Sequence, residues 1–178
     1  TGKGLSYGGS LARSEATGYG AVYFAQRMLE QHGQGLEGMK VSVSGTGNVA
    51  LHAMQKAVEL GATVIACSDS SGYIHDPDGL DVGLICDLKA NRNERISAYT
   101  RDMRGSATFC SQDSGSIWDV PCDCGLPCAT QNELDHHNAR TLVNNGAIAI
   151  IEGANMPCTS QAVRVFQSGG VLFAPGKA

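Results

Sequence analysis

A glycine-rich turn is the feature of this sequence whose residue types and spacing most directly suggest chemistry. Gly45, Gly47 and Ala50 form a G-x-G-x-x-A pattern that follows one apolar stretch and opens another. The first glycine permits a sharp turn, the second lets the backbone approach a diphosphate, and the alanine lets the next helix pack closely. A helix that begins at Asn48 and Val49 would offer free N–H groups to a dinucleotide's diphosphate. A glycine turn that binds no ligand is the alternative.

A carboxylate stands where the ribose of such a dinucleotide would lie. Asp69 follows the next apolar stretch and comes 22 residues after Gly47. An acidic residue about 20 residues beyond the glycine turn holds the ribose 2′-hydroxyl of NAD. Taken alone, Asp69 therefore favours NAD as the coenzyme.

Three basic residues favour the phosphorylated coenzyme instead. Lys89, Arg92 and Arg95 are spaced three residues apart, so on helical turns they would point roughly the same way. Arginine binds phosphate through planar, charge-assisted hydrogen bonds, and the hydroxyls of Ser68 and Ser70 could donate as well. The pattern predicts a 2′-phosphate site and hence NADP, with a solvated basic surface as the alternative.

The chain has seven cysteines, and some of them invite a metal-binding interpretation. Cys122, Cys124 and Cys128 form a C-x-C-x3-C pattern that is followed by His136 and His137, all of them residue types that bind zinc. The spacing is not the paired C-x2-C of common zinc sites, so a metal site is the weaker interpretation. No secretory signal segment opens the chain, and the sequence favours reduced, mostly buried thiols and a cytoplasmic location.

Short apolar stretches alternate along the chain with amphipathic ones, and the glycine turn joins one of each. This alternation predicts an α/β fold of Rossmann-like, dinucleotide-binding type, with a mostly parallel sheet flanked by helices. Strands are expected at residues 39–44, 63–67, 73–75, 123–126, 147–151 and 171–173. Helices are expected at residues 14–32, 49–60, 81–90, 94–101 and 133–144. The polar segment 104–119, anchored by Trp118, has no clear periodicity.

Length and composition limit what such a domain can do. The chain has 178 residues, a net charge of −4 and 6% aromatic residues. The length suits one domain, and an acidic balance with few aromatics argues against nucleic-acid binding. No apolar run reaches the roughly 18 residues of a membrane-spanning helix. The 23 glycines follow no collagen-like period, so they are expected at turns and close contacts.

Several longer motifs occur in order along the chain: TGKGLSYGGSLARSEATGYG, VSVSGTGNVA, GLPCATQNEL, EGANMP and GVLFAPGKA. With these motifs the chain closely resembles the hexameric, NADP-specific glutamate dehydrogenases of bacteria over essentially its whole length. The resemblance implies a C-terminally truncated coenzyme-binding domain at residues 36–178. It also implies that residues 1–35, a lead-in segment and the first helix, join that domain to an absent substrate domain.

The resemblance assigns roles to particular residues. Thr17 of the ATGYG motif and Asn48 of the glycine turn are expected to contact the coenzyme. The groups around the nicotinamide ribose are expected to be Ala129, Thr130, Gln131, Asn132 and Asn155. The basic residues at 89, 92 and 95 are expected near the adenosine 2′-phosphate, which strengthens the prediction of NADP. Asn132 has an alternative role as the cap of the helix expected from Glu133.

The implied reaction is the reversible oxidative deamination of L-glutamate to 2-oxoglutarate and ammonia. Its catalytic residues belong to the substrate domain upstream of Thr1, so no catalytic residue is expected in this chain, and the isolated chain is expected to be inactive. The full-length protein is expected to be a homohexamer. Two alternatives remain: a leucine, phenylalanine or valine dehydrogenase, which shares the fold, or a non-catalytic NADP-binding module.

Overall fold

A seven-stranded sheet forms the centre of the structure, a computed structural model that describes residues 6, 13–103 and 105–177. The strands are β1 (Lys40–Ser44), β2 (Thr63–Asp69), β3 (Gly72–His75), β4 (Thr108–Ser111), β5 (Cys124–Pro127), β6 (Ala149–Ile151) and β7 (Leu172–Ala174). Their order is β4-β3-β2-β1-β5-β6-β7. The strands from β2 to β7 in this order are parallel, whereas the β2–β3 and β3–β4 pairs are antiparallel. The predicted α/β fold with a mostly parallel sheet is therefore confirmed.

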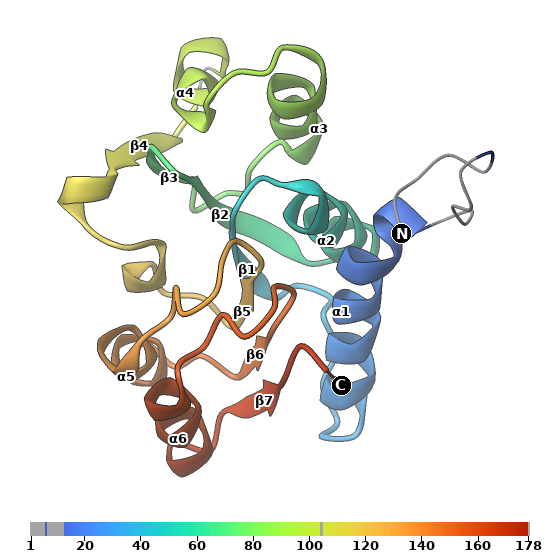
Figure 1. The fold of residues 1–178 in the computed structure, drawn as a ribbon, viewed down its shortest axis with the longest axis vertical. Coiled ribbons are helices and arrows are strands. Elements are labelled where there is room, and N and C mark those ends of the chain that lie inside the picture. Colours follow the sequence, from blue (N-terminus) through green and yellow to red (C-terminus); the bar gives the residue numbers. More distant parts are fainter. Residues whose placement is uncertain (1–5, 7–12, 104, 178) are drawn as a thin grey trace.

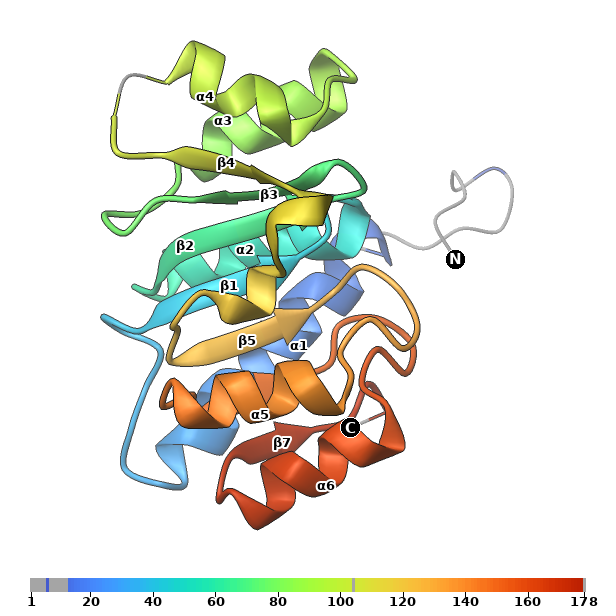
Figure 2. The same cartoon turned by 90° about the vertical axis from the view of Figure 1, so that its left-hand side faces the viewer.

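Helices cover both faces of the sheet (Figures 1 and 2). The four longer ones are α1 (Arg13–Glu30), α2 (Asn48–Glu59), α5 (His136–Asn144) and α6 (Ser160–Ser168). α1 and α2 pack together on one face, and α5 and α6 pack together on the other. Each layer has its own apolar core, with Val22 and Leu29 in the first and Leu142 and Phe166 in the second.

β1 lies at the centre of the sheet and leads directly into the glycine turn. Valine and serine alternate along this strand, yet Val41, Ser42, Val43 and Ser44 are all buried because helices cover both faces. The Ser44 hydroxyl accepts the N–H of Cys128 at 2.9 Å, which joins the end of β1 to the residue that follows β5. The carboxyl ends of these two strands are thereby held side by side.

α1 and α2 approach each other closely at Gly18. A Cβ atom at this position would lie 2.5 Å from the carbonyl oxygen of Val49 and 2.8 Å from the nitrogen of Ala53. Only a residue without a side chain fits this contact. The contact therefore fixes the first half of α1 beside the first turn of α2, immediately after the glycine turn.

The part of the chain after β3 differs most from the prediction. The helices expected at 81–90 and 94–101 are present, but neither is a regular α-helix along its whole length. These are α3 (Val82–Cys86) with a π turn (Asp87–Asn91), and a 3₁₀ turn (Ile96–Ala98) with α4 (Tyr99–Asp102). β4 falls in the polar segment for which the sequence predicts no element. It is a half-exposed edge strand, so its residues carry little of the apolar signal that marks a strand.

The helix expected from Glu133 begins three residues later, at His136. Asp135 caps this helix because its carboxylate accepts the N–H of Asn138 at 3.0 Å, and the Asn138 side chain accepts the N–H of Asp135. Because Asp135 is the cap, the alternative that Asn132 caps this helix is wrong, and Asn132 lies in the preceding loop with a φ of 57°. The sequence predicts no helix at α6. Trp118, the expected anchor of the polar segment 104–119, is buried.

The division into a lead-in segment at 1–35 and a domain at 36–178 stays a prediction. α1 packs against α2, β6 and β7, so the second half of the lead-in segment contacts the sheet layer directly. The opening TGKGLSYGG motif, apart from Ser6, lies outside the described residues. Among the helices that the structure describes, none combines the length and apolar character needed to cross a membrane.

Candidate functional site

A cavity of about 630 Å³ lies at the carboxyl ends of β1, β2 and β5. This is the edge at which open parallel α/β sheets bind their ligands. Nine of the predicted site residues line the cavity: Gly45, Gly47, Ser68, Asp69, Ser70, Lys89, Arg95, Ala129 and Thr130. The structure therefore brings together more than half of the predicted site, from five separate segments of the chain.

The glycine turn forms one wall of this cavity. Gly45 has a φ of 85°, in the left-handed region that favours glycine, and its N–H donates to the Ser68 hydroxyl at 3.0 Å. A Cβ atom on Gly45 would lie 3.0 Å from Cα of Ala129, so the turn also packs against the loop after β5. α2 begins at Asn48, and its cap residue Gly47 has no side chain to bond the first N–H groups. These N–H groups are the donors that a bound anion would use.

Asp69, predicted to hold a ribose, is already fully engaged with the protein. One carboxylate oxygen accepts both the N–H and the hydroxyl of Ser71, at 2.8 and 2.5 Å. The other accepts the N–H of Ile96 at 3.1 Å and lies 3.5 Å from Nζ of Lys89. Burial alone would raise the pKa of Asp69, but these hydrogen bonds and the Lys89 charge outweigh burial and lower it. Asp69 is therefore a charged group that fixes its neighbours at the cavity.

The three basic residues do not share one surface. Lys89 and Arg95 line the cavity, and Arg95 donates to the hydroxyl of Ser70. Arg92 lies outside the residues that line it and instead forms ion pairs with Asp87 at 2.6 Å and Asp102 at 2.5 Å. The expectation that all three point the same way is wrong, because a π turn and an extended residue replace the regular helix that it assumed.

Glu133 is a cavity residue that the sequence did not predict. Its Oε1 accepts the N–H of Ala129 at 3.0 Å and that of Thr130 at 3.3 Å, so the carboxyl group closes the loop after β5. Burial raises the pKa of Glu133, although hydrogen bonds from Ser44 and the two N–H groups act in the opposite direction. The one signal available in the sequence was its place directly after the Ala-Thr-Gln-Asn motif.

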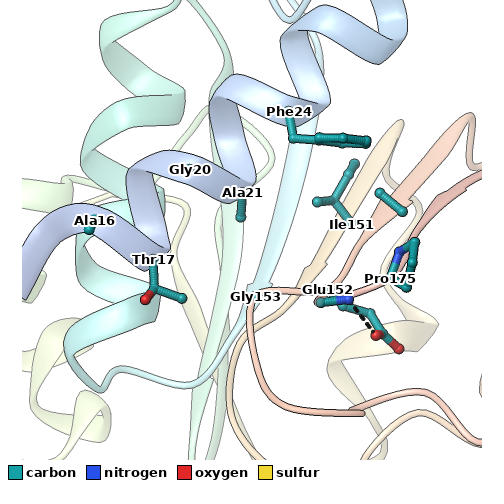
Figure 3. Close-up of a pocket in the computed structure, with 11 residues that line it drawn as sticks. Ala16, Thr17, Gly20, Ala21, Phe24, Ile151, Glu152, Gly153 and Pro175 are labelled. Carbon is teal, nitrogen blue, oxygen red and sulfur yellow. Dashed lines mark hydrogen bonds between the residues drawn. The ribbon is translucent and has the colours of Figure 1, made fainter. Parts of the chain in front are cut away.

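Thr17 lines a second, smaller cavity of about 250 Å³, between α1 and the carboxyl ends of β6 and β7 (Figure 3). Phe24 closes one side of it, and the buried Glu152 lies opposite. The Glu152 carboxylate accepts the N–H of Gly176 at 2.8 Å and that of Cys158 at 3.2 Å. Glu152 thus joins the loop after β6 to the turn after β7 and shapes the wall that faces Thr17.

The remaining predicted residues lie around these two cavities without lining them. They are Asn48, Val49, Gln131, Asn132 and Asn155. The Asn48 side chain donates to the carbonyl of Ser14 at the start of α1, and Val49 packs toward Gly153. The N–H of Asn132 donates to the carbonyl of Met156 at 3.0 Å, which ties the loops after β5 and β6 together. Roles for these five residues stay predictions.

The cysteine cluster does not form a metal centre in the part of the chain that the structure describes, which contains no suitable group of three or more His, Cys, Asp or Glu side chains. Cys122, Cys124 and Cys128 are buried, and burial raises the pKa of each thiol, in Cys122 to about 11. His136 and His137 are exposed in the first turn of α5. The zinc interpretation therefore finds no support.

The sheet, the glycine turn between β1 and α2, and the cavity at the carboxyl ends of the strands define a Rossmann-like α/β fold. The chain belongs to the glutamate/leucine/phenylalanine/valine dehydrogenase family, whose sequence profile matches residues 8–178. The resemblance seen in the motifs is thereby confirmed.

Two bacterial relatives are named NADP-specific glutamate dehydrogenase. The chain is 52% identical over 181 residues to that of Salmonella typhimurium and 53% identical over the same length to that of Escherichia coli. Each match covers all of this chain but 40% of the relative, so the chain spans less than half the length of these proteins.

Solved structures agree with this placement. The glutamate dehydrogenase of Plasmodium falciparum superposes with a TM-score of 0.92 at 40% identity, covering all of this chain and 38% of that one. A hetero-hexameric glutamate dehydrogenase from Thermus thermophilus gives a TM-score of 0.80 at 26% identity, over 99% of this chain and 39% of that one.

Proposed function

We propose that this chain forms the coenzyme-binding part of an NADP-dependent glutamate dehydrogenase. The observation that carries the proposal is the position of Lys89 and Arg95 in the cavity that also holds the glycine turn. This one cavity offers backbone N–H groups for a diphosphate and, beside Ser70, two cations for a further phosphate. NAD has no such phosphate, so these cations favour NADP.

The residues present fit NADP along its length. The backbone from Gly45 to Val49 would hold the diphosphate at the start of α2. Lys89 and Arg95 would hold the 2′-phosphate, and Asp69 would keep Lys89 in place. Because Asp69 already accepts three hydrogen bonds and forms an ion pair with Lys89, we assign it this supporting role in preference to direct binding of a ribose hydroxyl.

The smaller cavity would take the nicotinamide end. Thr17 would bond the carboxamide, and the Glu152 contacts would keep the wall opposite in shape. NADP, when bound, supplies the hydride acceptor of the reaction, and the protein groups here orient it. Thr130, Gln131, Asn132 and Asn155 remain the proposed contacts of the nicotinamide ribose.

Titration of the chain with reduced coenzymes, followed by nicotinamide fluorescence, tests this proposal. Charged hydrogen bonds to a phosphate contribute about 1.5–3 kcal/mol, so NADPH should bind about tenfold to a hundredfold more tightly than NADH. The same sample should produce no NADPH from L-glutamate and NADP. Equal affinity for the two coenzymes, or no binding of either, would contradict the proposal.

For the whole protein we propose reversible oxidative deamination of L-glutamate, a homohexameric assembly and a cytoplasmic location. The names of the relatives support this reaction over that of leucine, phenylalanine or valine dehydrogenases, and the hetero-hexameric Thermus protein supports hexameric assembly. Assays of the full-length protein with L-glutamate, L-leucine, L-phenylalanine and L-valine separate these reactions. Turnover of none of the four substrates would favour a non-catalytic NADP-binding module.

A further inference from the structure

Glu133 stands between two cavities and beside the glycine turn. It lines both the 630 Å³ cavity and a neighbouring one of about 280 Å³ that also contains Tyr73 and Trp118. Its Oε1 lies 3.0 Å from the nitrogen of Ala129, and Ala129 in turn packs directly against Gly45. Ala129 therefore lies between the carboxyl group and the turn that would hold a diphosphate.

No cation neutralises Glu133 within the described residues. The two basic groups of the cavity have other partners: Lys89 lies beside Asp69 and donates to the carbonyl of Glu94, and Arg95 donates to Ser70. The titratable and charged groups that face Glu133 from the surrounding elements are Tyr73, Asp69, Lys89, Arg95, Cys128 and Cys158. Neither Cys128 nor Cys158 can supply a positive charge, and burial raises the pKa of both thiols, so neither compensates the Glu133 carboxylate.

Opposing effects act on the protonation of Glu133 in the free chain. Half-burial raises the pKa of this carboxyl group, whereas three hydrogen bonds to it favour the charged form. An anion that enters the cavity adds a like charge, which makes the carboxylate less favourable still. Binding of a polyanion and loss of the Glu133 charge should therefore favour each other.

We propose that Glu133 takes up a proton when a phosphorylated dinucleotide binds in the cavity, so that binding and protonation are coupled. This inference rests on the proposed function, because it assumes that the ligand's diphosphate lies at the glycine turn. The proton comes from the buffer and adds to Oε2, while Oε1 continues to accept the two N–H groups. The affinity for the nucleotide consequently rises as the pH falls through the pKa of Glu133. A binding-induced pKa increase of one unit corresponds to about a tenfold change in affinity across that range.

Isothermal titration calorimetry in buffers of different ionisation enthalpy measures this proton uptake directly. We would titrate NADPH into the chain at about pH 6, above the ordinary pKa of a glutamate carboxyl group, so that a proton taken up on binding is measured as uptake. Glu133→Gln keeps an oxygen acceptor for the two N–H groups but cannot titrate. Glu37→Gln is the matched control, because Glu37 is exposed before the first residue of β1, at the opposite end of that strand from the cavity. The 2′-phosphate of NADPH also titrates near this pH, and its contribution cancels between the variants.

Wild type and Glu37→Gln should take up the same fraction of a proton per NADPH, and Glu133→Gln should take up measurably less. Equal proton uptake by all three proteins overturns the inference and leaves the proposed function intact. Absence of NADPH binding by the wild type overturns the proposed function, and with it the inference. Should Glu133→Gln fail to fold, carbon-13 NMR of the glutamate carboxyl groups in wild type gives the answer. The pKa of Glu133 must then rise on addition of NADPH, and an unchanged pKa overturns the inference.

Discussion

Lys89 reaches the cavity because Asp69 holds it there: the lysine Nζ lies 3.5 Å from the aspartate Oδ2. Asp69 is itself fixed by Ser71 and by the N–H of Ile96, so the cation is presented from a constrained position. A carboxylate at the end of β2 would be expected to select NAD. Here the same carboxylate supports a cation suited to the phosphorylated coenzyme.

Arg95 and Arg92 should therefore differ in their effect on coenzyme affinity. Arg95→Ala removes a group that lines the cavity and should weaken NADPH binding by about 1.5–3 kcal/mol, with little change for NADH. Arg92→Ala removes a residue paired with Asp87 and Asp102 and should weaken NADPH binding by less. Arg164→Ala, an exposed arginine on α6, is the control for lost surface charge. A larger loss from Arg92→Ala than from Arg95→Ala would show that the coenzyme rearranges these contacts.

Two glycines of α1 should respond in opposite ways to alanine. At Gly18 a Cβ atom would meet the backbone of α2 at 2.5 Å, so Gly18→Ala should destabilise the chain by about 1–3 kcal/mol. At Gly20 a Cβ atom meets nothing within 4 Å, so Gly20→Ala should stabilise it by about 0.5–1 kcal/mol. Urea denaturation of the two variants checks both signs. Equal effects would mean that the α1–α2 contact is looser than described.

The sequence predicts the strands and the glycine turn well because these features depend on local patterns. Apolar runs mark the buried strands, and Gly45 and Gly47 mark the turn whatever surrounds them. β4 and the start of α5 are different. The first is a half-exposed edge strand, and the second depends on reciprocal hydrogen bonds between Asp135 and Asn138 in a stretch that also contains other capping residues.

Some residues that line the larger cavity, such as Gly45 and Ala129, were predictable from motifs, whereas Glu133 reaches it only through packing. Equal spacing suggested one surface for Lys89, Arg92 and Arg95, but helix type decides where each side chain points, and the spacing cannot reveal a π turn. Glu133 and Glu152 act by accepting backbone N–H groups from loops brought together by folding. No spacing along the chain signals such contacts.

The cysteines should differ sharply in reactivity. Cys67, Cys122, Cys124, Cys128 and Cys158 are buried, whereas Cys86 and Cys110 are partly exposed. The thiolate is the reactive form, and burial raises the pKa of the five buried thiols and also that of Cys86, so exposure decides which cysteines react first. Brief treatment of the native chain with iodoacetamide, read by mass spectrometry, should modify Cys86 and Cys110 first. All seven should react in denaturant, and early modification of Cys128 would contradict the described burial.

Glu133 should also affect the pH dependence of stability. Burial raises its pKa in the folded chain, so the folded state holds this proton more tightly than the unfolded state. Its contribution to stability is therefore complete below the unfolded pKa and is lost as the pH rises through the folded value. Glu133→Gln should gain stability relative to wild type on going from about pH 4 to pH 7. Thermal melting of both proteins at the two pH values tests the sign, and a parallel change would refute it.

NMR amide shifts of the chain with NADPH and with NADH test the central claim most directly, because they locate both the coenzyme and the origin of selectivity. Both ligands should shift the amides of the glycine turn, the end of β2 and the loop after β5. The difference between the two ligands should be concentrated at Ser70, Lys89 and Arg95. Differences spread over the chain, or an unshifted glycine turn, would contradict the assignment of this cavity to NADP.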